Sequence, residues 1–227
     1  MTYAGEYSQI LRRTGSTEAD VELSFTRELR VRSVGQLTAE VGGASVPARW
    51  IEFEQTTQSG SGAVQDTGPG GQIIAKLLVP ESFIDGQFVD ARGIPKSAIP
   101  IVRGYLQRDG GPIEELPPGA YQPYPTITLL RMPSTLQQDE LDDFGDGGAT
   151  LKATQTLESA TTRTEVSMEL VRDPATPFGI ASWTVTTKEA TKQGAEPRSE
   201  YVPRSESTES MSLKSTDNGA VSAIDRD

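Results

Sequence analysis

The sequence predicts a mainly β protein, a sandwich or barrel of antiparallel strands with one short helix and extended terminal arms. Three observations lead to this fold class. Polar and apolar residues alternate in several segments, which is the two-residue period of a half-buried strand. Glycine-rich turn signals separate these segments, as in all-β domains. Prolines concentrate within residues 91–125, and proline lacks the backbone donor that a helix needs.

The clearest alternation covers residues 20–33. Its even positions carry charged or hydroxyl side chains, so we expect one long strand with an apolar side and a charged side. A helix would spread the same apolar residues around its circumference. Arg27 interrupts the apolar set, and we expect a bulge or bend there. The apolar residues are Val21, Leu23, Phe25, Leu29 and Val31.

Residues 36–41 and 46–56 are expected to form two further strands, separated by a glycine pair. In the second of these strands, Trp50 shares a face with Glu52 and Glu54. A large ring between carboxylates can mark a surface that is meant to be covered, although a partly exposed Trp is also common. Trp50 is therefore a candidate for a covered face.

A long Gly/Ser loop is expected at residues 57–71; loops of this length are usually functional or disordered. Residues 72–79 follow as an apolar run that contains one charge, Lys76. Such a run predicts a strand that is buried on both faces. The Asp85-Gly86 pair lies between apolar residues and predicts a hairpin.

The second half of the chain adds further strands and the one helix. Residues 123–132 resume an extended segment, and residues 133–144 are the helix candidate, with Ser134 as its N-cap. Residues 163–170 and 180–187 alternate again, and each predicts a strand.

This organisation divides the chain into three parts. Residues 1–19 are interpreted as a polar N-terminal arm, residues 20–187 as the β-rich core domain and residues 188–227 as a polar C-terminal tail. The tail is rich in Ser, Thr, Glu, Lys and Arg. A segment of this composition buries too little apolar surface to become ordered alone. We therefore expect a neighbouring subunit to order it.

Composition excludes several classes of function. The 227 residues include no Cys and no His, which excludes disulfides, thiolate or imidazole metal sites, and catalysis by histidine. The net charge is −11, whereas a nucleic-acid groove needs clustered Lys and Arg. We therefore expect no direct binding to nucleic acid.

Membrane insertion and secretion are also not expected. The longest apolar run, residues 73–80, is too short to span a bilayer. The first residues lack the basic and apolar regions of a signal peptide. We therefore expect synthesis in the cytoplasm of a host cell. The structural role considered below implies a final location in a virus particle.

An acidic cluster precedes and overlaps a glycine-rich turn. Clustered carboxylates with turn carbonyls suit Ca²⁺, but the spacing departs from the EF-hand pattern, and a solvated helix end is the better explanation of the cluster. We predict no cofactor. The candidate metal ligands are Asp139, Asp142, Asp143 and Asp146.

Asp66-Thr67-Gly68 spells the triplet of aspartic proteases. In those enzymes two such aspartates share a proton. Here the triplet lies in a Gly-rich loop and has no second copy, so the match is interpreted as chance. No residue is predicted to be catalytic, and the chain is not expected to be an enzyme.

The expected function is that of a structural subunit in a large assembly, most plainly a tail-tube, head–tail connector or capsid-associated protein of a tailed virus. Its partners would be copies of itself and other assembly subunits. One alternative is a carbohydrate- or receptor-binding module that uses Tyr121 and Tyr124. Another alternative is a hydrolase that works through carboxylates. The candidate interface residues are Glu22, Glu28, Arg30, Arg32 and Trp50.

Overall fold

The computed structural model describes residues 1–59, 70–83, 99–121, 150–173, 175 and 180–226. These residues are nearly all in antiparallel strands, which confirms the mainly β fold class. The strands are β1 (Thr2–Leu11), β2 (Val21–Val41), β3 (Ala44–Ser59), β4 (Gly71–Pro80), β5 (Ile99–Ile101), β6 (Arg103–Arg108), β7 (Glu114–Leu116), β8 (Gly119–Tyr121), β9 (Thr150–Glu158), β10 (Thr162–Arg172), β11 (Ile180–Thr191) and β12 (Val202–Ser215). Two single-turn 3-10 helices, η1 (Glu81–Phe83) and η4 (Arg198–Glu200), accompany them.

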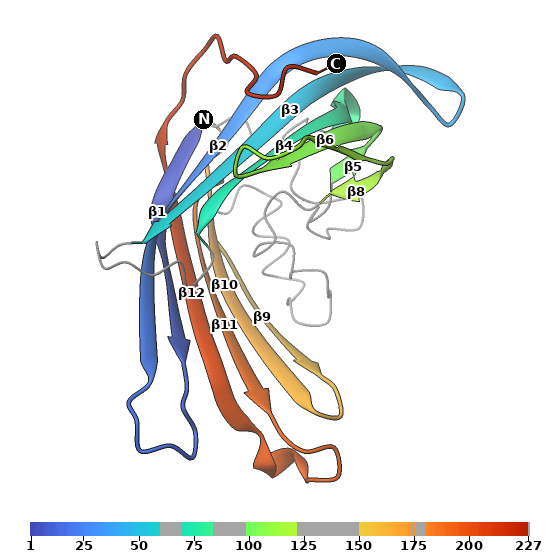
Figure 1. Cartoon of the computed structure of the whole chain (residues 1–227). Helices are drawn as coiled ribbons and strands as arrows, with labels where there is room; N and C mark the ends of the chain where they lie inside the picture. The colour runs from blue at the N-terminus through green and yellow to red at the C-terminus, as the bar shows by residue number, and fades with distance from the viewer. Residues whose placement is uncertain (60–69, 84–98, 122–149, 174, 176–179, 227) are drawn as a thin grey trace.

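One open sheet of ten strands dominates the fold. Its order is β7, β6, β4, β3, β2, β1, β12, β11, β10, β9, and Figure 1 shows these strands side by side in a strongly curved sheet. The outermost strands, β7 and β9, do not pair with each other. The large sheet is therefore neither a closed barrel nor one half of a sandwich of equal sheets. Among the described strands, β5 and β8 form a second sheet.

The two terminal segments lie at the centre of this sheet, which corrects the expectation of an arm and a tail. Strand β1 pairs with β2 on one side and with β12 on the other. The N-terminal segment forms a strand because its alternate residues pack on one face; Tyr3 is fully buried, and its hydroxyl donates to the Ile180 carbonyl at 2.9 Å. Burial raises the pKa of Tyr3 above its usual value.

Strand β12 shows why the polar composition of residues 188–227 led to the wrong expectation of a tail that needs a neighbouring subunit. Thr208, Ser210 and Ser212 lie on the face opposite to that of Met211, which is buried, and Glu209, which is buried in an ion pair. Neighbours on both sides, β1 and β11, satisfy its backbone. A strand flanked on both sides needs few apolar residues, because its ladders and one packed face hold it in place.

Strand β2 is longer than predicted and joins the two expected strands of residues 20–33 and 36–41. Its 21 residues extend over about 70 Å. The register shifts at Val34, between Ser33 and Gly35, so the bulge lies there. The prediction of a bulge or bend at Arg27 was wrong. Because side chains alternate, the extra residue moves the following odd positions to the opposite face of the sheet.

The two faces of the sheet differ in chemistry. The side that carries Leu29 and Trp183, called here the apolar face, holds the larger core, which extends from β4 and β6 to β10. The side that carries Arg32 and Glu52, called here the charged face, is lined with ion pairs near β2 and β3. Strand β4 is buried on both faces, as predicted.

A buried ion pair crosses β1 on the apolar face. Arg27 of β2 contacts the Glu209 carboxylate of β12, and both side chains are less than one-tenth exposed. Gly5 of β1 lies directly opposite Arg27. Since glycine has no side chain, nothing on β1 at this level stands between the guanidinium and the carboxylate.

Further contacts fix this ion pair. The Arg27 Nε–H donates to Thr57 Oγ1 at 3.1 Å, and the guanidinium carbon lies 4.4 Å from the ring centre of Tyr7. The Trp183 Nε1–H donates to Glu209 Oε1 at 2.8 Å. Charged groups at this depth are tolerated only when their hydrogen bonds are satisfied. Arg27 therefore interrupts the apolar pattern of β2 as half of a buried pair.

Several predicted elements lie outside the described residues. These are most of the Gly/Ser loop, the Asp85-Gly86 hairpin, the strand at 123–132 and the helix at 133–144. Among the described residues, no helix is long and apolar enough to cross a membrane.

We predict that Gly5→Ala destabilises the protein. A Cβ at this position would lie 1.8 Å from the Ser210 carbonyl oxygen, and a backbone atom cannot rotate away. The expected loss in the free energy of unfolding is about 3 kcal/mol, measured by urea denaturation. Gly194→Ala is the matched control, because its Cβ would meet nothing closer than 3.9 Å. Equal midpoints for both variants would contradict the close packing of β1 against β12.

We also predict that Arg27→Met lowers stability by about 3–5 kcal/mol, because it removes the guanidinium that neutralises a buried carboxylate. The double variant Arg27→Met/Glu209→Gln should recover much of this loss, since the glutamine is neutral and still accepts from Trp183. Thermal unfolding of the two variants measures the difference. A double variant less stable than Arg27→Met alone would argue against a coupled pair.

Candidate functional site: a peptide clamp on the charged face

Residues of opposite charge alternate across the charged face where β2, β3 and β4 run side by side. The register places Arg32, Glu52 and Lys76 directly opposite one another on these three strands. Arg30 and Glu54 form the neighbouring cross-strand pair. Opposite charges at facing positions stabilise a sheet, so the sequence of each strand is matched to the next.

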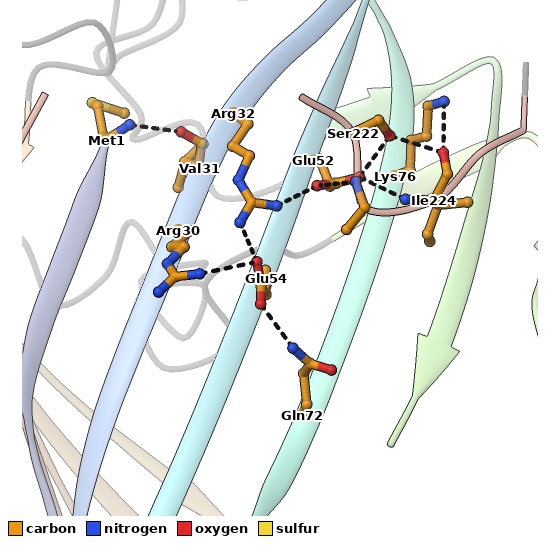
Figure 2. Close-up of polar contacts among 11 residues, drawn as sticks. Met1, Arg30, Val31, Arg32, Glu52, Glu54, Gln72, Lys76, Ser222 and Ile224 are labelled. Carbon is orange, nitrogen blue, oxygen red and sulfur yellow. Dashed lines mark hydrogen bonds and ion pairs between the residues drawn. The ribbon is translucent and has the colours of Figure 1, made fainter. Parts of the chain in front are cut away.

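Three side chains contact the Glu54 carboxylate. The Arg32 Nη2 atom donates to Glu54 Oε2, and Gln72 Nε2 donates to Glu54 Oε1 at 2.7 Å (Figure 2). Arg30 Nη1 lies 3.8 Å from the same carboxylate and its Nη2 lies 2.6 Å from Glu28 Oε1. Nearby, the Met1 amino group donates to the Val31 carbonyl at 2.9 Å.

Arg32 joins the two buried carboxylates. Its Nη1 atom donates to Glu52 Oε1 at 2.6 Å, in addition to the contact with Glu54. Burial acts to lower the pKa of Arg32, but the hydrogen bond to Glu52 and the charges of both carboxylates outweigh it, so the pKa is raised. Arg32 therefore stays cationic in the folded chain.

The fully buried carboxylate of Glu52 binds the backbone of the C-terminal segment. It accepts hydrogen bonds from the Ala223 N–H at 2.9 Å and the Ile224 N–H at 3.2 Å, and from Ser222 Oγ at 2.8 Å (Figure 2). Hydrogen bonds to an ionised acceptor are stronger than neutral ones. We call residues 222–226 the C-terminal clasp.

Lys76 holds the carbonyl side of the same segment. Its Nζ atom, which is buried, donates to the Ile224 carbonyl at 3.1 Å and to the Arg226 carbonyl. The ammonium also lies 5.0 Å from the ring centre of Trp50. Thus one carboxylate binds two consecutive N–H groups, and one ammonium binds two carbonyl oxygens.

The Ile224 side chain provides the apolar anchor of the clasp. It is fully buried in a second core on the charged face, together with Trp50, whose ring is stacked on Tyr105 at 5.8 Å. The bulge at Val34 helps to build this core, since it turns Leu37 and Ala39 toward this side of the sheet. The other buried members are Ala48, Ile74 and Leu78.

We call Glu52, Lys76 and the apolar core around Trp50 the peptide clamp, because together they have the chemistry to bind a peptide segment. It offers a buried anion for N–H groups, a buried cation for carbonyl groups, and an apolar pocket for one aliphatic side chain. In the structure the occupant is the chain's own C-terminal segment, which crosses β2 and β3 (Figure 1).

The structure brings most of the predicted interface residues together. Glu28, Arg30 and Arg32 are ion-paired within the chain on the charged face. Trp50 was a candidate for a covered face, and it is 2% exposed beneath the clasp. Glu22 lies apart, exposed and opposite Ile10. Contact of these residues with another subunit stays a prediction.

Other candidate sites find no support among the described residues. No group of acidic residues in that part of the chain could hold a metal ion; the cluster of Asp139, Asp142, Asp143 and Asp146 lies outside it, as does Asp66. Trp50, Tyr105 and Trp183, the other aromatic side chains that could line a sugar-binding surface, are all buried.

Sequence reasoning missed the central residues of the clamp. Glu52 was noted only as a neighbour of Trp50, and Lys76 only as a charge in an apolar run. That isolated charge was the available signal, because a lysine in a strand buried on both faces needs partners. Nothing in the composition of residues 222–226 indicated that they would bind there.

Comparisons of the chain with protein-family models, with curated proteins and with solved structures find no match.

We predict that Glu52→Gln loosens the clasp while the sheet stays folded. The amide keeps one acceptor but loses its charge, so amide hydrogen exchange at Ala223 and Ile224 should become about tenfold faster. Glu54→Gln is the matched control, because the hydrogen bonds and ion pairs of Glu54 go to Arg32, Gln72 and Arg30 and not to the clasp. If both variants exchange at the same rate at these two amides, Glu52 does not hold the clasp.

Proposed function

We propose that this protein is a structural subunit that assembles with copies of itself through the open edge of its sheet at β9. A virus particle, as a tail, connector or capsid-associated component, is the setting that the sequence favours. The mechanism is burial of interfaces and pairing of strands, without a chemical step.

The observation that carries this proposal is the difference between the two edges. At one edge, β7 has only three residues, two of them exposed glutamates, and short charged strands resist pairing. At the other edge, β9 has nine residues without proline, and no described strand pairs with its outer side. A long edge with free N–H and C=O groups is a template for a further strand.

The sequence of β9 is also complementary to itself. If two copies pair in antiparallel orientation around residue 155, Thr154 of each copy lies opposite Thr156 of the other, and Lys152 lies opposite Glu158. Within one chain Lys152 is paired with Glu169, and Glu158 with Arg163 and Arg198, so the contact would extend existing ion pairs. Opposite charges and hydroxyl pairs at facing positions are favourable. Such pairing around a two-fold axis would join two ten-stranded sheets into one continuous sheet.

The outer face of the sheet that begins at this edge carries small polar side chains. One row of hydroxyl residues crosses six neighbouring strands, each residue opposite the next in the register. Small side chains of this kind leave the outer face level and without apolar patches. The row consists of Thr154, Ser167, Thr186, Thr208, Ser8 and Ser24.

Proline substitutions in β9 test the proposal. Successive N–H groups of a strand point to opposite sides, so Thr156→Pro and Leu157→Pro differ in what they remove. The Ser159 N–H donates to the Thr162 carbonyl of β10, so the Leu157 N–H, two residues away, also points toward β10 and the Thr156 N–H points to the open edge. Leu157→Pro is therefore the ladder variant, which removes a donor that pairs with β10, and Thr156→Pro is the edge variant, which removes a donor at the open edge. The wild-type protein should associate in sedimentation velocity experiments at rising concentration. The edge variant should be monomeric and keep the wild-type melting temperature, whereas the ladder variant should melt earlier.

Two results would contradict the proposal. The first is a wild-type protein that stays monomeric at every concentration tested. The second is association that persists unchanged in both proline variants, because this would place the contact on another surface.

A further inference from the structure

We propose that the C-terminal clasp also binds in trans, so that residues 222–226 of one copy occupy the peptide clamp of a second copy. This deepens the proposed function, because it adds a second contact between copies, on the charged face and independent of β9.

The clasp of any copy of the chain could make the contacts that hold the clasp in the clamp. Four of its contacts go to backbone groups: two N–H groups bound by Glu52 and two carbonyls bound by Lys76. Among the clasp side chains, only Ile224 is buried. These contacts depend on the sequence of the segment and on the clamp, but not on which chain supplies the segment.

The connector between β12 and the clasp is suited to redirection. Residues 216–221 are exposed throughout, and Gly219 has a φ of 81°, a conformation that glycine adopts without strain. Val221, next to the clasp, is 81% exposed. An exposed aliphatic side chain beside a docked segment gains contacts when a second copy lies against it.

Concentration decides between the two modes of docking. A short connector holds the clasp near its own clamp at an effective concentration of about 1 mM or more. Docking within one chain therefore dominates in dilute solution. In an assembly, neighbouring clamps are present at comparable local concentration, and exchange of an identical element between copies costs little because the same contacts are made.

Photo-crosslinking of the full-length chain tests the inference. The side chain of Ala223 is exposed, so the substitution of Ala223 by the photoreactive residue p-benzoyl-phenylalanine leaves the hydrogen bonds of the clasp in place. Labelled (¹⁵N) and unlabelled protein are mixed in equal amounts, concentrated and illuminated. Mass spectrometry then identifies peptides of β3 or β4 joined to the clasp. If exchange is complete, about half of these cross-linked peptides should contain both isotopes.

Two controls make the result specific. The probe at Ser16, an exposed residue in the β1–β2 turn, should give no mixed-isotope cross-links to β3 or β4. Adding Glu52→Gln to the probe variant should lower the yield of all clasp cross-links, because the clamp then binds more weakly.

The outcomes separate this inference from the proposed function. Mixed-isotope cross-links that persist in both the Thr156→Pro and the Leu157→Pro backgrounds support exchange of the clasp, even if pairing at β9 fails. Cross-links that contain only one isotope at every concentration overturn the inference and leave the β9 proposal intact.

Discussion

The buried ion pair between Arg27 and Glu209 links the two halves of the sheet across β1. One meander of strands precedes β1 in the sheet order and another follows it, so β1 is the seam between the two halves. Arg27 reaches over this seam at Gly5, the one level where β1 offers no side chain. Because both charges are buried, each half of the sheet loses a partner if the other half moves. The pair therefore couples the two halves into one unit.

Buried charges are also paired on the charged face, but there they contact a peptide backbone as well as each other. There, buried charges are paired across β2, β3 and β4, but Glu52 and Lys76 direct part of their hydrogen-bonding capacity outward, to a peptide backbone. The bulge at Val34 places apolar residues beside these charges. A site with both polarities and an apolar pocket results, and the C-terminal segment occupies it. Stability and recognition thus use the same set of residues.

The proposed assembly rests on two features, the outer edge of β9 and a C-terminal segment that is bound through its backbone. In that assembly a copy of the same chain would satisfy the contacts of both, at β9 through strand pairing and at the charged face through the clasp. The net charge of −11 opposes association at long range. In the proposed pairing of two β9 strands, facing charges such as Lys152 and Glu158 would favour one geometry over non-specific contact.

Local patterns determined much of the fold. The alternation of residues 20–33, the apolar run that became β4 and the strands β10 and β11 were readable because a period of two encodes which face is buried. Arg27 and Lys76 were visible as exceptions, but their meaning was not, since Glu209 and residues 222–226 are distant in sequence. Only the tertiary structure decided that the polar terminal segments lie at the centre of the sheet and that the last residues close the clamp. The physical reason is that a strand paired on both sides, or a segment bound by its backbone, needs partners more than it needs apolar side chains of its own.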